Sequence, residues 1–261
     1  MTNEELLGKQ NILLSFLEWF GELTQFCWRL ARAMVTPPFE IRELLRQMHE
    51  IGTKSLPLVA MAGGAIGVVL SMHARDSLVR FGAKSLLPML IILSIIKESG
   101  PIITALVVSG RVGAGIGAEL GSMKVTEQID AIEASAVDTF KLLIVTRVLA
   151  CVLMLPLLTI VADFCGIMTG WIANVLIEPM PFTFYIRNGF KSITFSDFLP
   201  AIFKTLVFGL LIGIIGCFQG LRTQGGTEGV GRASTSAVVI ASLSVILADV
   251  ILVRLIILFF S

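Results

Sequence analysis

Residues 55–72 read SLPLVAMAGGAIGVVLSM, a stretch of 18 residues without a charged side chain. A transmembrane helix needs about 20 mostly apolar residues, so this stretch with its flanks is long enough to cross a bilayer. The whole chain has a similar character, because 55% of its 261 residues are hydrophobic and only 15% are charged, with a mean hydropathy of +0.89. A soluble domain carries roughly 25% charged residues. The sequence therefore predicts an integral membrane protein.

Four more apolar segments have the length of a membrane span. They are residues 85–110, 148–177, 198–221 and 233–260. Each contains one or two charged side chains, which are Lys97 and Glu98, then Asp163, then Lys204, and finally Asp249 with Arg254. The predicted fold class is therefore an all-α integral membrane protein with about five transmembrane helices, and an odd number of spans places the two termini on opposite sides of the membrane.

The first 54 residues are amphipathic rather than uniformly apolar. Residues 16–35 mix apolar and charged side chains, and Trp19 and Trp28 suit the depth of the lipid head groups. After a proline pair, residues 39–54 repeat apolar side chains at helical spacing opposite a charged face. We expect two helices in the membrane interface over residues 1–54, followed by a transmembrane domain over residues 55–261. The alternative is a pair of soluble helices packed on a partner.

Basic residues outside the spans are distributed unequally. Twelve lie in the N-terminal segment and in the loops after the second and fourth spans, against five in the other loops. The positive-inside rule then predicts a cytoplasmic N-terminus and a C-terminus outside. The first residues lack the pattern of a signal or transit peptide, which favours a bacterial inner membrane with a periplasmic C-terminus.

The sequence contains no recognisable catalytic motif and no Walker A loop. We therefore expect a non-catalytic chain with no metal and no cofactor of its own, whose ATP-driven role would depend on another chain. The charge is nearly balanced, so a nucleic-acid partner is not expected. Residues 113–118 match a loose dinucleotide pattern, but a membrane span precedes them instead of a strand, and the glycines spaced four apart favour close helix packing.

A charged stretch with helical periodicity connects the second and third predicted spans. Val125, Ile129 and Ile132 form one stripe of it. A second face is acidic, and its members are Glu127, Asp130 and Glu133. These patterns predict a short amphipathic helix at about residues 119–137 on the cytoplasmic side. The alternative is a solvated connector.

Four short motifs follow one another in this region. They are Lys97-Glu98-Ser99-Gly100-Pro101, Gly110-Arg111-Val112-Gly113, Ala118-Glu119-Leu120-Gly121-Ser122-Met123 and Thr126-Glu127-Gln128-Ile129-Asp130-Ala131. In this order they resemble the MlaE/YrbE family of ABC-transporter permeases, and the likeness extends over most of the chain. The resemblance implies a permease homodimer that moves phospholipids or related lipids between the inner membrane and an MCE-domain protein. A separate ATPase dimer, which holds the ATP and Mg, would drive it, and a small STAS-type subunit is a further candidate partner.

The resemblance also implies two sets of functional residues. The lipid cavity would be lined by Lys97, Glu98, Gly100 and Pro101, with a helix break at residues 99–101. The coupling helix would contact the ATPase through Glu119, Val125, Glu127, Ile129, Asp130, Ile132 and Glu133. Family members commonly have Asp-Pro where this chain has Asp138-Thr139, so the end of that helix is less sharply defined.

Two other functions remain open from the residues alone. One is an ion-coupled secondary carrier that uses the charges within the spans, and the other is a membrane scaffold without transport. Lys97 and Glu98 point about 100° apart on a helix, so each needs its own partner. In a purely structural role Glu98 would pair with Lys204 or Arg254, and Lys97 with Asp249.

Overall fold

The computed structural model describes residues 3–37, 40–191 and 193–260, and its regular elements over these ranges are all helices. η1 is a 3-10 helix, and η2, η3 and η4 are π-helical turns. In chain order the elements are α1 (Asn3–Val35), α2 (Ile41–Arg80), η1 (Lys84–Leu86), α3 (Leu87–Ser94), η2 (Ile95–Ser99), α4 (Gly100–Val108), η3 (Ser109–Gly113), α5 (Ala114–Val125), α6 (Gln128–Ala134), η4 (Phe140–Val145), α7 (Thr146–Val175), α8 (Phe182–Phe190), α9 (Phe195–Leu221) and α10 (Gly226–Phe260).

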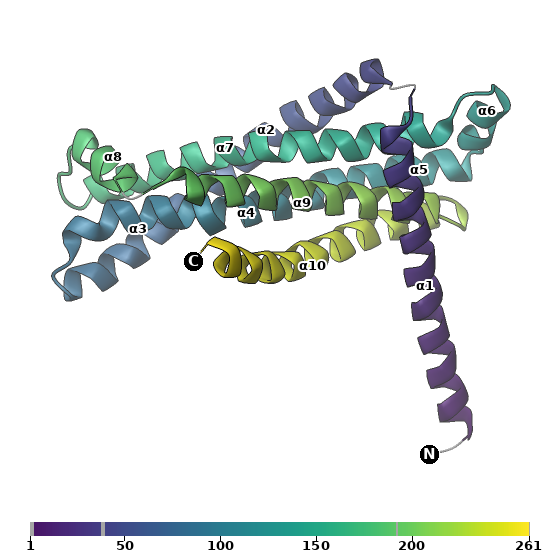
Figure 1. The fold of residues 1–261 in the computed structure, drawn as a ribbon, viewed down its shortest axis with the longest axis horizontal. Coiled ribbons are helices and arrows are strands. Elements are labelled where there is room, and N and C mark those ends of the chain that lie inside the picture. The colour runs from purple at the N-terminus through teal and green to yellow at the C-terminus, as the bar shows by residue number, and fades with distance from the viewer. Residues whose placement is uncertain (1–2, 38–39, 192, 261) are drawn as a thin grey trace.

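Five segments of the described chain are long and apolar enough to cross a membrane. They are Ile41–Arg80, Lys84–Val125, Phe140–Val175, Asp197–Leu221 and Gly226–Leu258. Figure 1 shows them side by side, with α6 at one end of the bundle and α8 at the other. The predicted all-α membrane fold with five spans is confirmed.

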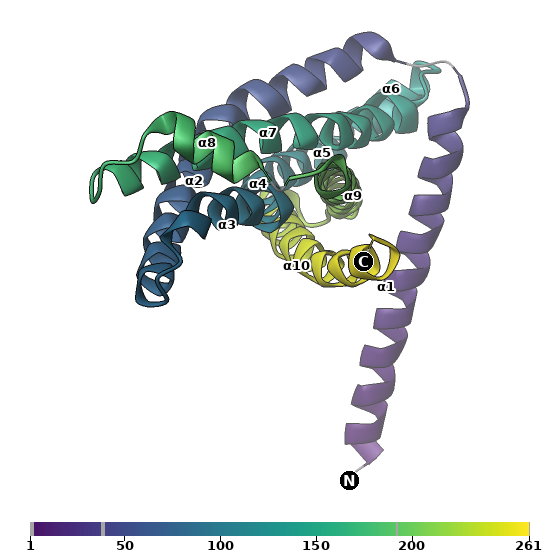
Figure 2. The same cartoon turned by 60° about the vertical axis from the view of Figure 1, so that its left-hand side comes forward.

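Helix α1 runs across the end of the bundle that carries α6 (Figures 1 and 2). Its Leu30 is buried in the main core, and the ring of Phe26 packs edge-on against Phe140 and Phe218. Its other side leaves Trp28 exposed, together with Leu17 and Phe20. A helix that lies across the spans with exposed aromatic and apolar side chains is typical of the membrane interface.

Helix α2 joins the second amphipathic segment to the first span without interruption. It begins at Ile41 and continues to Arg80, with Pro57 inside it. A proline in a helix removes one backbone hydrogen bond, but packing of the long helix on α7 compensates. No break therefore separates residues 41–54 from the span, although the amphipathic pattern suggested a separate helix.

Small residues allow the backbones of neighbouring spans to approach closely. A Cβ atom at Gly67 of α2 would overlap the backbone of Gly166 on α7, and one at Gly209 of α9 would overlap the Cys151 carbonyl. Hydroxyl groups add bonds between the same helices, since Ser71 Oγ donates to the carbonyl oxygen of Gly170 at 2.9 Å. In lipid, where apolar burial does not drive association, such contacts hold helices together.

Candidate functional site

The second span contains two π-helical turns, and both fall on the motifs that the sequence singled out. η2 ends at Ser99, and the Gly100 N–H bonds to the carbonyl of Ile95, five residues earlier, where an α-helix would use the residue four earlier. Pro101 has no N–H, so it leaves the Lys97 carbonyl without its usual donor. The expected helix break at residues 99–101 is wrong, because a widened turn carries the helix through. Such turns occur frequently at functional sites.

The adjacent Lys97 and Glu98 reach different partners, as the geometry of a helix requires. Lys97 Nζ lies 2.6 Å from Asp197 Oδ1, at the start of α9. Glu98 Oε2 lies 2.8 Å from Lys204 Nζ, one of its two anticipated partners. The suggested pairing of Lys97 with Asp249 is wrong, since Asp249 Oδ1 lies 2.9 Å from Lys204 Nζ instead.

Lys204 is the centre of this cluster. Its side chain is only 3% exposed, and it stands between the buried Asp249 and Glu98, whose side chain is 47% exposed. Its Nζ also lies 3.5 Å from the Lys97 carbonyl that Pro101 leaves free. A buried cation within a span is stable only when it is paired, so Asp249 and Glu98 hold Lys204 in place, and Glu98 remains accessible to a ligand.

Gly100 and Pro101 lie inside the protomer. A Cβ atom at Gly100 would overlap Asp163 Oδ1 on α7, so a larger residue here would force the Asp163 side chain to move. Asp163 is itself buried, and its Oδ1 has no hydrogen-bond partner among the residues described. Both motif residues are buried within the single chain, and their place in a lipid cavity stays a prediction.

Asp197 was not among the residues selected from the sequence. Its Oδ2 accepts a hydrogen bond of 2.9 Å from the Thr194 N–H at the start of α9, while its Oδ1 forms the ion pair with Lys97. Thr194-x-x-Asp197 is a capping box, a local signal that could have revealed it.

The second and third spans are connected, at the end of the bundle that carries α6, by a turn between two helices. α5 ends at Val125, Glu127 has a left-handed φ of 57°, and α6 begins at Gln128. The expected single helix over residues 119–137 is therefore wrong, because a non-glycine residue with positive φ interrupts it.

The predicted coupling residues differ in how accessible they are. Ile129 is 6% exposed and belongs to the chain's own core, so it is not free to dock on a partner as expected. Ile132 and Val125 are half-buried, whereas Glu127, Asp130 and Glu133 are exposed. α6 thus presents mainly its acidic side to the outside.

One ion pair connects this end of the bundle to α7, and one hydrogen bond connects it to Thr139, the residue before η4. Glu119 Oε1 lies 2.8 Å from Arg147 NH2, and the Arg147 side chain is 2% exposed. Thr139 Oγ1 donates to Glu133 Oε1 at 2.7 Å. A cavity of about 260 Å³ adjoins α6, with Arg29 and Lys124 among its lining residues beside Asp130 and Glu133.

Over the described ranges no three His, Cys, Asp or Glu side chains come together in the way a metal site requires. All four cysteines are free thiols.

Fold and site together define a membrane protein with five spans, paired charges inside the bundle and a helical turn exposed at one end. Residues 44–255 match the family model described as Permease MlaE, and the chain belongs to that family. It is therefore a transmembrane subunit of the ABC-transporter class, which implies an ATPase partner. This assignment decides against a secondary carrier.

Similar chains occur in several organisms. A probable ABC transporter permease protein of Rickettsia typhi is 34% identical over 250 residues, which cover 96% of each chain. One of Synechocystis sp. is 36% identical over 208 residues, or 80% of this chain and 79% of the other. One of Pyropia yezoensis is 28% identical over 240 residues, or 92% and 91%.

Proposed function

We propose that this permease moves phospholipids or related lipids between the bacterial inner membrane and an MCE-domain partner, driven by ATP and Mg on a separate ATPase dimer. The observation that carries the proposal is that two adjacent charged residues, Lys97 and Glu98, are both half exposed on a π turn within a span. Charges inside a membrane are costly and usually functional.

Lys97 is the group that meets the lipid phosphate. Its side chain is half exposed, and its partner Asp197 belongs to a different span, so a phosphate can replace that carboxylate on the ammonium group. Glu98 is also half exposed, and it stays anchored through the buried Lys204. A lipid head group would therefore meet one cation that is free to change partner and one carboxylate held in position.

The working unit is a homodimer. α10 has a row of exposed apolar side chains, which are Leu243, Ile246, Leu247, Val250 and Ile251. Such a surface suits lipid tails or a second copy of the chain, and two copies can enclose acyl chains that one bundle leaves uncovered.

Coupling to the ATPase occurs at α6. Two exposed acidic residues, Asp130 on α6 and Glu127 in the turn before it, can contact basic groups on the partner, while the buried Ile129 fixes α6 to the bundle. Movement of a partner is transmitted only through such a packed element. The Glu119–Arg147 ion pair then links α5 to α7. A small STAS-type subunit would join the same assembly.

The proposed orientation puts α6 and the N-terminus in the cytoplasm and the C-terminus in the periplasm. Two features agree with it. The basic residues outside the spans favour this side, and α1 and α6 lie at the same end of the bundle (Figure 1).

The test is transfer of a fluorescent phospholipid by the complex of permease, ATPase and MCE protein in liposomes. Lys97→Met and Glu98→Gln should each lower transfer at least about tenfold, because a charge-assisted contact contributes about 1.5–3 kcal/mol. Both proteins should remain folded and bound to the ATPase.

The matched controls are Lys54→Met and Glu50→Gln, which change the same residue types in an exposed ion pair outside the cluster. They should transfer lipid normally. Unchanged transfer in both cluster variants would place them off the lipid path, and loss of assembly together with transfer would show a structural role only.

A further inference from the structure

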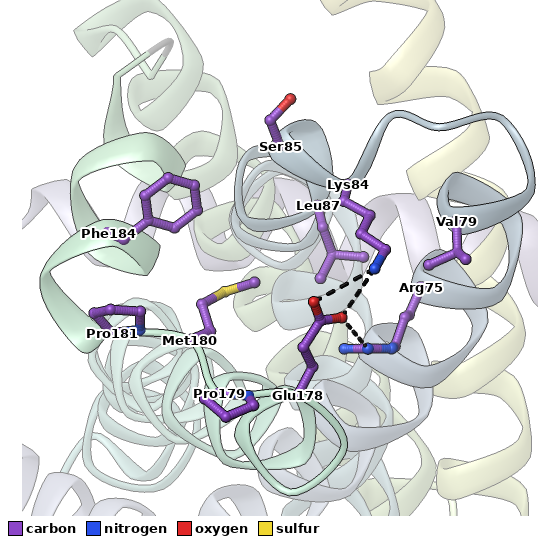
Figure 3. A pocket seen from close by; sticks show the side chains of 10 residues that line it. All are labelled: Arg75, Val79, Lys84, Ser85, Leu87, Glu178, Pro179, Met180, Pro181 and Phe184. Atoms are coloured by element: carbon purple, nitrogen blue, oxygen red, sulfur yellow. Dashed lines mark hydrogen bonds and ion pairs between the residues drawn. The ribbon is translucent and has the colours of Figure 1, made fainter.

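A second cavity lies at the end of the bundle opposite α6. Its volume is about 320 Å³, and it is bounded by the end of α2, the start of η1 and α3, and the segment from Glu178 to Phe184 (Figure 3). One corner is charged and the remaining wall is mostly apolar. The apolar lining residues are Val79, Leu87, Pro179, Met180, Pro181 and Phe184.

The charged corner has two cations and one carboxylate. Glu178 Oε2 lies 2.7 Å from Arg75 NH2 and 3.1 Å from Lys84 Nζ, and Figure 3 shows both cations pointing at it. The hydrogen bond from Lys84 holds the pKa of Glu178 below its usual value, so the carboxylate is charged at neutral pH. The corner keeps one excess positive charge, and its carboxylate is exposed.

The wall of the cavity is held in place by the core. Trp171 Nε1 donates to the Met180 carbonyl oxygen at 3.2 Å, and the Trp171 ring packs edge-on against Phe182. Tyr185 is fully buried in the cluster around Ile92. The cavity is therefore formed before any ligand arrives, which lowers the entropic cost of binding.

We propose that this cavity binds a phospholipid at the membrane surface, with the phosphate on Arg75 and Lys84 and the start of the acyl chains against the apolar wall. Guanidinium and ammonium groups are strong phosphate donors. Exposed ion pairs contribute little stability, so a phosphate can displace the Glu178 carboxylate. The cavity size is within the usual range of ligand pockets.

This site is separate from the Lys97 and Glu98 pair and does not depend on lipid transport. Inorganic phosphate has the same anionic group but gains nothing from the apolar wall. Location beside the ends of three spans, next to an aromatic pair, favours the lipid as the source of the phosphate.

The experiment uses the full chain in a maltoside detergent, with Phe184 replaced by photoreactive benzoylphenylalanine. Light-induced attachment of tritiated phosphatidylglycerol then reports binding at this cavity alone. Arg75→Gln and Lys84→Gln should each raise the half-saturating lipid concentration about tenfold. Glu178→Gln should lower it, because the competing carboxylate is gone.

Arg187→Gln, which removes a cation on α8 that does not line the cavity, is the matched control and should bind like the parent. A millimolar excess of inorganic phosphate should leave attachment unchanged. Equal binding by the parent and both cation variants, weaker binding by Glu178→Gln, or full competition by inorganic phosphate would each overturn the proposal. Lipid transfer by the assembled complex is measured in a separate assay. A negative result in that assay would therefore be distinguishable from a negative result in the attachment assay.

Discussion

Replacing Lys204 with methionine tests whether one buried cation holds the charged cluster together. Methionine has a similar length and keeps most of the packing, but it removes the charge between Asp249 and Glu98. Asp249 is buried and would lose the ion-pair partner that the structure gives it. Glu98 is half exposed and can turn toward water, so most of the penalty comes from Asp249.

Breaking a buried ion pair by removing one member costs about 3–5 kcal/mol, because the other charge remains desolvated. For a chain of this size, each kcal/mol corresponds to roughly 2–4 °C in melting temperature. We therefore expect Lys204→Met to lower the melting temperature in detergent by roughly 10 °C.

The assay is a thermal melt of the purified chain, combined with a double-mutant cycle. Asp249→Asn added to Lys204→Met removes the stranded charge, so it should recover at least about half of the lost stability. Arg254→Met is the control, since it removes another cation from the same apolar region. A Lys204→Met protein as stable as the parent, or a double variant less stable than the single one, would refute the reasoning.

Three further predictions concern other parts of the chain. Gly100→Ala should destabilise the protein by about 1–3 kcal/mol because its methyl group overlaps Asp163, whereas Gly110→Ala, with open space around its Cα, should melt like the parent; equal melting of the two would contradict the close contact. Asp130→Lys reverses an exposed charge on α6, so it should leave the melting temperature unchanged but lower the ATPase recovered by copurification several-fold, and undiminished recovery would count against docking there. The folded-state pKa of Glu178 is lowered, so its contribution to stability is present above the unfolded pKa and is lost as the pH falls through the folded value. The melting difference between the parent and Glu178→Gln should begin to shrink near the unfolded Glu value of about 4.3 and disappear at more acidic pH, and a difference that grows in acid would have the wrong sign.

Hydropathy and helical periodicity predicted the five spans and the amphipathic N-terminal region. These patterns are local, because a bilayer forces each segment to satisfy its own backbone hydrogen bonds inside a helix. The same reasoning located Lys97 and Glu98 as intramembrane charges and required that they take separate partners. The order of the four motifs was enough for the resemblance to the permease family.

The sequence patterns did not predict the irregular turns of the backbone. The widened turn lies just before Pro101, which has no backbone N–H, and Gly100 packs closely against Asp163 on α7, a helix far away in the sequence. The positive φ at Glu127 likewise divides a stretch whose periodicity is compatible with one helix. Periodicity reports which face of a segment is apolar and contains no information on such irregular turns.

Only the tertiary structure decided which charges meet. Lys97 could pair with any carboxylate in the membrane. Packing of α9 beside η2 brings Asp197 to Lys97 and Lys204 to Glu98, and packing of α9 on α10 brings Lys204 to Asp249. The same holds for Ile129, whose apolar character suited a partner's groove as well as the chain's own core. The sequence determines that an apolar side chain must be buried and that a charged side chain in the membrane must find an opposite charge. Which partner each side chain contacts depends on the distance and rotation at which the helices pack, and these are properties of the whole bundle.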